Sequence, residues 1–203
     1  MVSVFDIFKI GIGPSSSHTV GPMVAAGRFL TRLNRLQATW NVARVRATLY
    51  GSLAYTGLGH GTDRAILLGL SGERPDDIDP AAISSLLAKI AQSGFLQLGG
   101  HQPTRFDAKS DLVFDVKTPS PGHPNGLRLE AFDSAGSVLA SRVYFSVGGG
   151  FVVPEDYHCQ RRHAALCGSG GPAALERMIS RPRDKDRGSE HDVAPGGGSG
   201  KPD

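Results

Sequence analysis

The sequence predicts an α+β domain in which helices pack on one face of an antiparallel sheet, followed by a disordered C-terminal tail. Three observations predict this fold: apolar residues at helical spacing in the first half, strand-like patterns in the second, and a tail poor in large apolar residues. The 203 residues are enough for one domain with an appendage. We place the domain at residues 1–155 and the tail at residues 156–203.

Three amphipathic helices are predicted, each from a starting signal and from apolar spacing. The first includes Pro22 in its first turn, where the missing N–H of proline costs nothing. The second begins at Thr62, and the third begins after Asp79 and ends near Gly94. Their apolar faces consist of Met23, Ala26, Leu30 and Leu33, of Ile66, Leu67 and Leu70, and of Ile83, Leu86, Leu87 and Ile90.

Strands are predicted on both sides of these last two helices. Residues 43–49 alternate apolar and polar side chains, which is typical of a half-buried strand. Strand patterns return at 111–117, 127–133 and 137–147, and a short one follows at 151–153. The segments between these later strands are short and rich in turn residues, so we expect successive strands to pair as an antiparallel meander.

The C-terminal tail differs in composition from the domain. Only six large apolar residues occur among its last 47 positions, namely Tyr157, Leu166, Leu175, Met178, Ile179 and Val193. Such a segment cannot bury enough apolar surface to offset an ordering cost of about 1–2 kcal/mol per residue. We therefore expect disorder in the tail, with at most a short helix at 172–180.

Charge and cysteine content argue against several classes of protein. Residues 1–156 carry 14 Lys and Arg against 13 Asp and Glu, and no basic run is interleaved with aromatic residues as in a nucleic-acid surface. No apolar run approaches the roughly 20 residues of a membrane span. Cys159 and Cys167 do not make a disulfide framework. We therefore expect a cytoplasmic protein that binds neither nucleic acid nor membrane.

The segment directly before the first helix is the strongest functional signal. Serine and threonine compete with the backbone for hydrogen bonds, which favours a loop or a helix cap. A helix N-terminus offers free N–H groups and a positive dipole end, which together receive anions such as a carboxylate. Five adjacent hydroxyl or imidazole side chains exceed the needs of capping, so we interpret the segment as a ligand loop. These side chains are Ser15, Ser16, Ser17, His18 and Thr19.

A second concentration of polar residues lies at 57–64, where three glycines flank a histidine. The imidazole of His60 can act as a general base near neutral pH, and Asp63 is the candidate carboxylate to tune it. The same pattern also fits a glycine-rich turn in which Asp63 only starts a helix. A third segment, His123 with Asn125, fits either a structural turn between strands or a part of a site.

In order and spacing, residues 13–19, 59–63 and 123–126 resemble the N-terminal, or β, domain of iron–sulfur-dependent L-serine dehydratases. The opening residues and the strand at 144–152 also look like that family, so the resemblance runs through about Glu155. It implies the conversion of L-serine to pyruvate and ammonia in amino-acid degradation. It also implies a 4Fe–4S cluster that acts as a Lewis acid on the departing hydroxyl.

The resemblance also implies roles for single residues. His18, His60 and His123 correspond to histidines at the family's active site, with His60 as the expected proton-transfer group and Asp63 orienting it. The expected substrate-binding residues are Ser15, Ser16, Ser17, Thr19, Gly61, Thr62 and Asn125. No metal ligand is expected in this chain.

The sequence departs from the family after the domain. A 4Fe–4S cluster is normally held by cysteine thiolates, and the family carries them in a C-terminal α domain. Cys159 and Cys167 lie in a tail unlike the family, so we expect no cluster on this chain alone. We expect a truncated or frameshifted product that is inactive by itself. The alternatives are a β subunit completed by a separate α chain and a stand-alone amino-acid or effector-binding module. A homodimer is a further candidate assembly.

Overall fold

The structure, a computed structural model, describes residues 13–120 and 122–156. Its helical elements are η2 (Ser16–Val20), α1 (Gly21–Arg35), η3 (Thr39–Asn41), α2 (Ser52–Thr56), η4 (Leu58–His60), α3 (Thr62–Leu70), α4 (Pro80–Ser93) and α5 (Ala108–Asp111). Its strands are β1 (Arg44–Gly51), β2 (Phe95–Leu98), β3 (Gln102–Arg105), β4 (Leu112–Asp115), β5 (Asn125–Phe132), β6 (Val138–Gly148) and β7 (Phe151–Pro154). In this part of the chain, no helix combines the length and apolar character that crossing a bilayer requires. Beyond Asp156, the predicted tail lies outside the described residues. Its disorder and the domain boundary at 155 therefore stay predictions.

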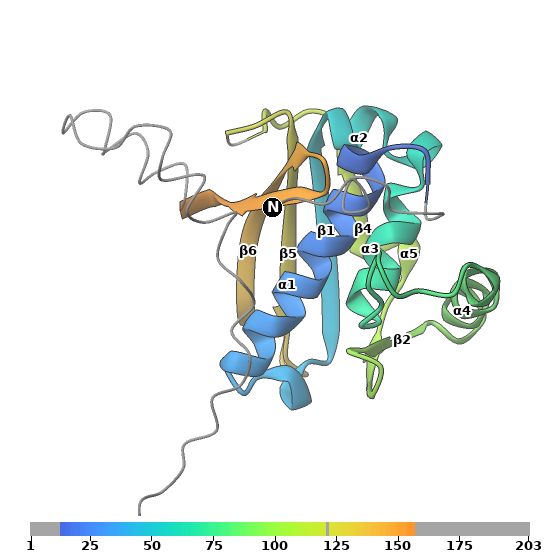
Figure 1. Cartoon of the computed structure of the whole chain (residues 1–203). Coiled ribbons are helices and arrows are strands. Elements are labelled where there is room, and N and C mark those ends of the chain that lie inside the picture. The colour runs from blue at the N-terminus through green and yellow to red at the C-terminus, as the bar shows by residue number, and fades with distance from the viewer. Residues whose placement is uncertain (1–12, 121, 157–203) are drawn as a thin grey trace, which may run out of the picture. The chain divides into compact units, whose positions relative to one another are not determined.

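Seven strands of the described chain form one mixed sheet in the order β2-β3-β1-β5-β6-β7, with β4 also pairing β1 (Figure 1). Four neighbouring pairs are antiparallel: β2 with β3, β1 with β5, β5 with β6, and β6 with β7. The strand β1 runs parallel to β3 and to β4, which follow one another along the same edge. The predicted α+β class is confirmed, and two parallel pairings are added to it.

The position of β4 differs from the predicted meander. The successive pairs β5–β6 and β6–β7 do form antiparallel hairpins. By contrast, β4 lies beside β1, with Ala47 opposite Leu112, while β5 occupies the other edge of β1. The segment 116–124 therefore crosses the end of β1 rather than making a hairpin. A connection of this length can pass over one strand, and turn residues alone do not show whether it does.

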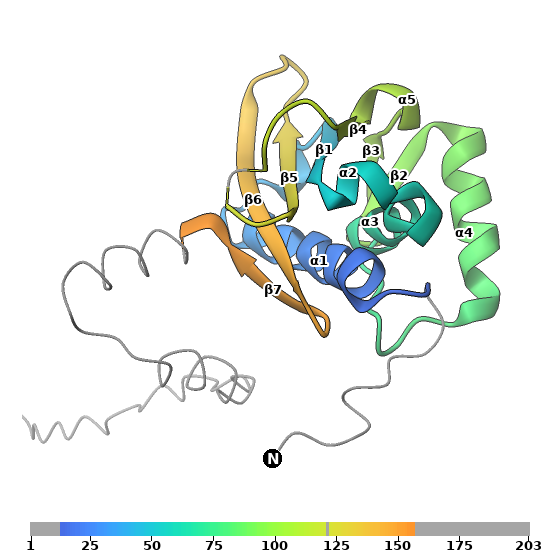
Figure 2. The ribbon, with the colours of Figure 1, turned by 90° about the horizontal axis from the view of Figure 1, so that it is seen from above.

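The helices α1 and α3 cover one face of the sheet, as predicted (Figures 1 and 2). The inward side chains of β1 alternate with outward ones, so Val45, Ala47 and Leu49 are buried. Phe29 and Leu33 of α1 complete this core from the helical side. Burial of apolar surface, worth about 25 cal/mol per Å², holds the helical layer on the sheet. The helix α4 packs outside α3 (Figure 2).

A close helix crossing determines where the polar loops meet. A Cβ at Gly69 in α3 would lie 2.4 Å from the carbonyl oxygen of Met23 in α1, so only glycine allows this approach. Ala26 and Ala65, both fully buried, are the small residues beside it. The crossing sets the first turn of α1 against the last turn of α3. The turn η2, which precedes α1, then lies beside the start of α3 at the end of the sheet where β1 finishes (Figure 1).

Candidate active site

Three predicted loops meet where β1 ends. Gly51, the last residue of β1, and Ser52, which follows it, join two of these loops. Gly51 has a φ of +54°, and a Cβ there would lie 2.3 Å from the carbonyl oxygen of Pro124. The next residue, Ser52, donates its backbone N–H to that same oxygen at 2.8 Å. The side-chain Oγ of Ser52 lies 3.0 Å from Nε2 of His18. Ser52 therefore connects the loop of His123 to the loop of His18.

The first helical turn is a π turn, η2, and Pro22 explains it. In a regular α-helix the N–H of residue 22 would bond the carbonyl oxygen of His18, and proline has no N–H to give. The hydroxyl of Thr62 donates to the His18 carbonyl instead. Single π turns inside helices are frequent at functional sites. The helical N-terminus thus lies at Ser15, whose Oγ accepts the backbone N–H of His18 at 3.3 Å, rather than at Pro22.

Two threonines join the loops of His18 and His60 reciprocally. The Oγ1 of Thr19 donates to the carbonyl oxygen of His60 at 2.9 Å, and Oγ1 of Thr62 donates to that of His18. Both threonines are fully buried. Their hydroxyl hydrogens are therefore used in holding the two loops together. Their predicted part in substrate binding stays a prediction.

His18 and His60 are neighbours, with ring centroids 4.9 Å apart and ring planes inclined by 39°. The Nδ1 of His18 lies 3.0 Å from Oγ of Ser17. Partial burial, and secondly the nearby His60, lower the pKa of His18 below its usual value. His18 therefore resists protonation more than a solvent-exposed histidine does.

The tautomer of His60 follows from its hydrogen bond. Its Nδ1 lies 2.9 Å from the carbonyl oxygen of Thr56, and a carbonyl can only accept, so Nδ1 carries the hydrogen when the ring is neutral. The lone pair of a neutral His60 is then on Nε2, and none of the described residues donates a hydrogen bond to that nitrogen. This geometry leaves Nε2 able to accept a proton.

Asp63 does not take the orienting position predicted for it. The hydrogen-bond partner of His60 Nδ1 is the Thr56 carbonyl, and Oδ1 of Asp63 is buried without a hydrogen-bond partner among the described residues. Asp63 lies in the first turn of α3, where the helix dipole favours a carboxylate. The Thr56 carbonyl bonds His60 because residues 56 and 60 are one helical turn apart. Gly61, with a φ of +68°, then makes the left-handed turn between η4 and α3.

The serine loop and the third loop complete this end of the sheet. Ser15 and Ser17 place their hydroxyl oxygens 3.3 Å apart, and Ser16 is exposed. In the third loop, Nδ1 of His123 accepts the backbone N–H of Asn125 at 3.1 Å. The amide of Asn125 donates to the carbonyl oxygen of Ser146 at 3.1 Å. The three loops thus lie at one end of the sheet. His18 and His60 contact each other, whereas the ring of His123 lies 6.4 Å from that of Phe145.

Sequence reasoning missed the residues that link the loops. Ser52 comes three residues after the predicted strand at 43–49, and Thr56 lies one helical turn before His60, but neither belongs to a histidine-rich segment. Ser146 was also missed, although its Oγ is fully buried without a partner among the described residues. Its Oγ would lie 1.9 Å from a Cβ at Gly21, so the serine packs tightly against the start of α1. For Ser52, the available signal was the sequence Gly51-Ser52 just after the strand pattern.

A 4Fe–4S cluster does not fit the described residues. They include no cysteine, because Cys159 and Cys167 both lie outside them. Within residues 13–120 and 122–156, no group of three or more His, Cys, Asp or Glu side chains is placed to hold a metal ion. This part of the chain supplies imidazoles and hydroxyls for chemistry, and helix N-termini for binding an anion.

Comparison with known proteins decides the family. The model of the serine dehydratase beta chain family matches residues 3–157. This chain belongs to the serine dehydratase beta chain family. It is 48% identical over 155 residues to an L-serine dehydratase of Streptomyces coelicolor, covering 76% of this chain and 34% of that protein. An L-serine dehydratase of Mycobacterium bovis is 50% identical over 155 residues, with 76% and 33% covered. L-serine dehydratase 2 of Escherichia coli is 44% identical over 167 residues, with 82% and 36% covered.

The serine dehydratase beta chain match covers the whole histidine end of the sheet, which we define as residues 15–19, 51–63 and 120–125 without residue 121. This chain spans about a third of the length of these curated relatives. The family assignment therefore includes every residue of the candidate site.

Proposed function

We propose that this serine dehydratase beta chain supplies the proton-transfer and carboxylate-binding groups of an L-serine ammonia-lyase. The observation that supports this most is the contact of His18 with His60 at the shared start of two helices. In the proposed reaction a base removes the α-proton of L-serine, and the β-hydroxyl departs as water. The resulting aminoacrylate tautomerises to an imine and hydrolyses to pyruvate and ammonia.

We assign the base to Nε2 of His60. Because the Nδ1 hydrogen is directed to the Thr56 carbonyl, a proton arriving at the ring is accepted at Nε2. His18 has a lowered pKa and stays neutral beside it, so it does not oppose the positive charge that His60 acquires. We assign to His123 and Asn125 a place in the same site from the third loop.

The substrate carboxylate is proposed to bind between the serines and the start of α3. The helical segment that begins at Ser16 and the helix α3 that begins at Thr62 both direct their N-termini to this end of the sheet. Backbone N–H groups and two positive dipole ends make such a place favourable for an anion. The hydroxyls of Ser15, Ser16 and Ser17 and the backbone at Gly61 are the proposed contacts.

The rest of the enzyme is proposed to cover this end. Five large apolar side chains on the elements that end or begin here are exposed, and they are Tyr55, Leu58, Val116, Val147 and Phe151. Exposed apolar side chains gathered around polar groups mark an interaction surface. We propose that an α domain or α chain packs here and carries the 4Fe–4S cluster of the complete enzyme. Since the described residues do not fit a cluster, we expect this chain alone to release no pyruvate.

A chimeric enzyme tests the assignment of His60. Residues 1–155 of this chain replace the matching part of the Streptomyces coelicolor L-serine dehydratase, to which they are 48% identical. We expect pyruvate release from L-serine, and we expect His60→Gln to lower kcat about 10²- to 10⁴-fold because a general base is lost.

His101→Gln is the matched control for this experiment. His101 also bonds a backbone carbonyl through Nδ1, that of Gly99 at 2.8 Å, but it lies outside the three loops. Its replacement should leave kcat within about twofold, as for surface substitutions generally. Equal activity of the two variants would remove His60 from the mechanism, and an inactive parent chimera would contradict the proposed function itself.

A further inference from the structure

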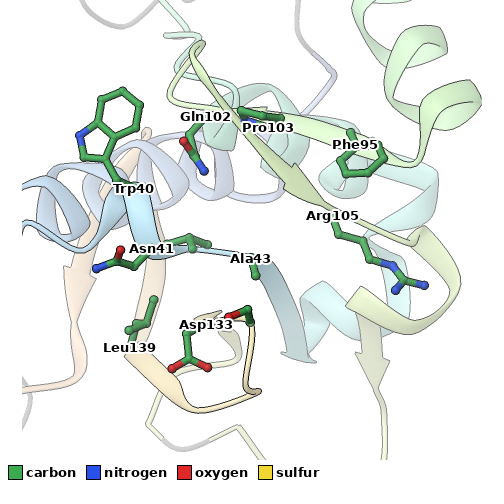
Figure 3. A pocket seen from close by; sticks show the side chains of 11 residues that line it. Trp40, Asn41, Ala43, Phe95, Gln102, Pro103, Arg105, Asp133 and Leu139 are labelled. Carbon is green, nitrogen blue, oxygen red and sulfur yellow. The ribbon is translucent and has the colours of Figure 1, made fainter.

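A cavity lined by three arginines lies at the opposite end of β1 from the histidines. It has a volume of about 380 Å³ and is lined by Ala43, Arg44, Arg46, Arg105, Phe132, Asp133, Ser134 and Gly136. We call it the arginine pocket. A larger cavity of about 630 Å³ adjoins it and shares Ala43, Arg105, Asp133 and Ser134 with it. Figure 3 shows the larger cavity, with Arg105 extending from one side of it and Asp133 lying near Leu139 and Ala43.

The strand register places the arginines side by side. Arg44 is opposite Arg105 in the parallel β1–β3 pair and opposite Phe132 in the antiparallel β1–β5 pair. Arg46 is two residues further along β1, on the same face. Neighbouring strands lie about 4.8 Å apart, and like charges directly opposite each other destabilise a sheet. Three guanidinium groups at adjoining positions therefore concentrate positive charge at this end of the sheet.

Only one of these arginines has an ion pair within the described part of the chain. Arg44 bonds the buried carboxylate of Asp111, with Nε 2.6 Å from Oδ1. The guanidinium of Arg46 lies 5.5 Å from the centre of the Phe132 ring, and its Nε is buried without a hydrogen-bond acceptor among the described residues. A buried donor without a protein acceptor is rare in folded proteins, and such a donor often bonds a water, an ion or a ligand.

The acidic residues nearby make no ion pair with Arg46 or Arg105 within the described part of the chain. Glu130, in register with Arg46, accepts the hydroxyl of Ser141 at 3.5 Å and makes no ion pair within the described residues. Asp133 accepts two backbone N–H groups of its own turn through Oδ1. Asp107 accepts a backbone N–H and a hydroxyl of α5. The pKa of Asp107 is lowered first by its hydrogen bonds to Lys109 and Ser110 and, less, by the charge of Arg105. Neither Arg46 nor Arg105 makes an ion pair within the described residues, so both guanidinium groups keep donors for an anion.

We propose that the arginine pocket binds a small oxyanion, a phosphate- or carboxylate-bearing molecule, at a site separate from the histidines. Arginine suits this role because its planar guanidinium forms paired hydrogen bonds with carboxylate and phosphate oxygens. The pocket is concave and of the size typical of small-ligand sites. The guanidinium of Arg46 lies over the Phe132 ring, and Arg105 lines the pocket from β3.

Binding of inorganic phosphate and of succinate to the full chain tests the proposal. Isothermal titration is run against sodium chloride at equal ionic strength, and the two anions compete in a second titration. We expect saturable binding with mutual competition, and Arg46→Gln or Arg105→Gln should weaken the affinity about tenfold or more, as expected for a charged hydrogen-bond donor. The tighter of the two anions identifies the ligand class.

Arg128→Gln is the matched control. Arg128, on β5, lies on the same face of the sheet as Arg46, and its guanidinium also lies over an aromatic ring, 5.8 Å from the centre of Tyr50. It should retain wild-type affinity, and so should Ser17→Ala, which removes a proposed contact of the substrate carboxylate and thereby separates the two sites. Chloride acting as well as phosphate, or equal losses in Arg46→Gln and Arg128→Gln, would overturn the proposal. If Arg46→Gln fails to fold, the exposed Arg105 decides the outcome alone. Binding by the isolated chain but not by the chimera would mean that an acidic protein segment fills the pocket, which also overturns it.

Discussion

The two ends of β1 hold polar side chains in different ways. At the histidine end the partners are mostly backbone atoms. The hydroxyls of Thr19 and Thr62 donate to the backbone carbonyls of His60 and His18. The Nδ1 of His60 bonds the backbone carbonyl of Thr56. At the arginine pocket the partners are side chains, as in the Arg44–Asp111 ion pair and the contact of Arg46 with Phe132. The histidine end therefore depends on the path of the backbone, whereas the arginine pocket depends on the identity of its side chains.

This difference predicts how each end responds to substitution. A bond to a backbone atom fails when the backbone moves, even if every polar side chain is kept. A contact between side chains fails only when one of them is replaced. Changes in backbone conformation should thus be costly at the histidine end and mild at the arginine pocket, and a glycine at each end allows the comparison.

The largest expected effect on stability is that of Gly51→Ala. The new Cβ would lie 2.3 Å from the Pro124 carbonyl oxygen, on a residue whose φ is +54°. Backbone strain of about 1–3 kcal/mol and overpacking of similar size should together lower the free energy of unfolding by about 3 kcal/mol or more. Urea unfolding followed by circular dichroism measures the loss.

Gly136→Ala is the corresponding change at the arginine pocket. Gly136 has a φ of +84°, but a Cβ there would meet nothing within 4 Å. Only the backbone strain remains, so we expect a loss of about 1 kcal/mol. If both variants lose the same amount, close backbone approach does not distinguish the two ends.

Thr62→Val should have an intermediate effect. The substitution keeps the shape of the fully buried side chain and removes the donor to the His18 carbonyl, which Pro22 cannot replace. A buried acceptor left without its partner costs about 1–3 kcal/mol. Thermal or urea unfolding gives the change, with Thr31→Val as the control because its hydroxyl bonds the Gly27 carbonyl on an exposed helix surface. A Thr62→Val variant as stable as that control would show that the link between the loops contributes little.

The elements that could be predicted are those with local signals. The helix between Asp79 and Gly94 begins and ends as its capping residues indicate. The helix predicted from Thr62 also begins there, although its N-cap is Gly61 and no side chain caps it. The hairpins of β5, β6 and β7 follow from turn residues between alternating patterns. The place of β4 could not be predicted, because its partner β1 lies more than 60 positions away and no local pattern records a parallel pairing.

In the candidate site, too, the residues with a local sequence signal could be predicted and their backbone partners could not. The residue types of His18 and His60 identify the two loops, and their contact was expected from the resemblance. The partner of His60 was missed, because any residue at position 56 offers the same carbonyl oxygen. The π turn was missed for a related reason: Pro22 at a helix start normally costs nothing, and its effect here arises only because helical turns begin earlier, at Ser16.

The smallest expected effect is a pH dependence that originates at His18. Burial and the nearby His60 lower the pKa of His18 in the folded state, so the unfolded chain binds this proton more readily. Its contribution to stability is fully present above the ordinary histidine pKa and is lost as the pH falls from there through the lowered folded pKa. Unfolding free energies between about pH 5 and pH 8 should therefore rise with pH more steeply in the wild type than in His18→Gln. The exposed His101→Gln should keep the wild-type slope. Identical slopes in His18→Gln and the wild type would show that His18 titrates as it does in solvent, and the neutral role proposed for it beside His60 would no longer hold.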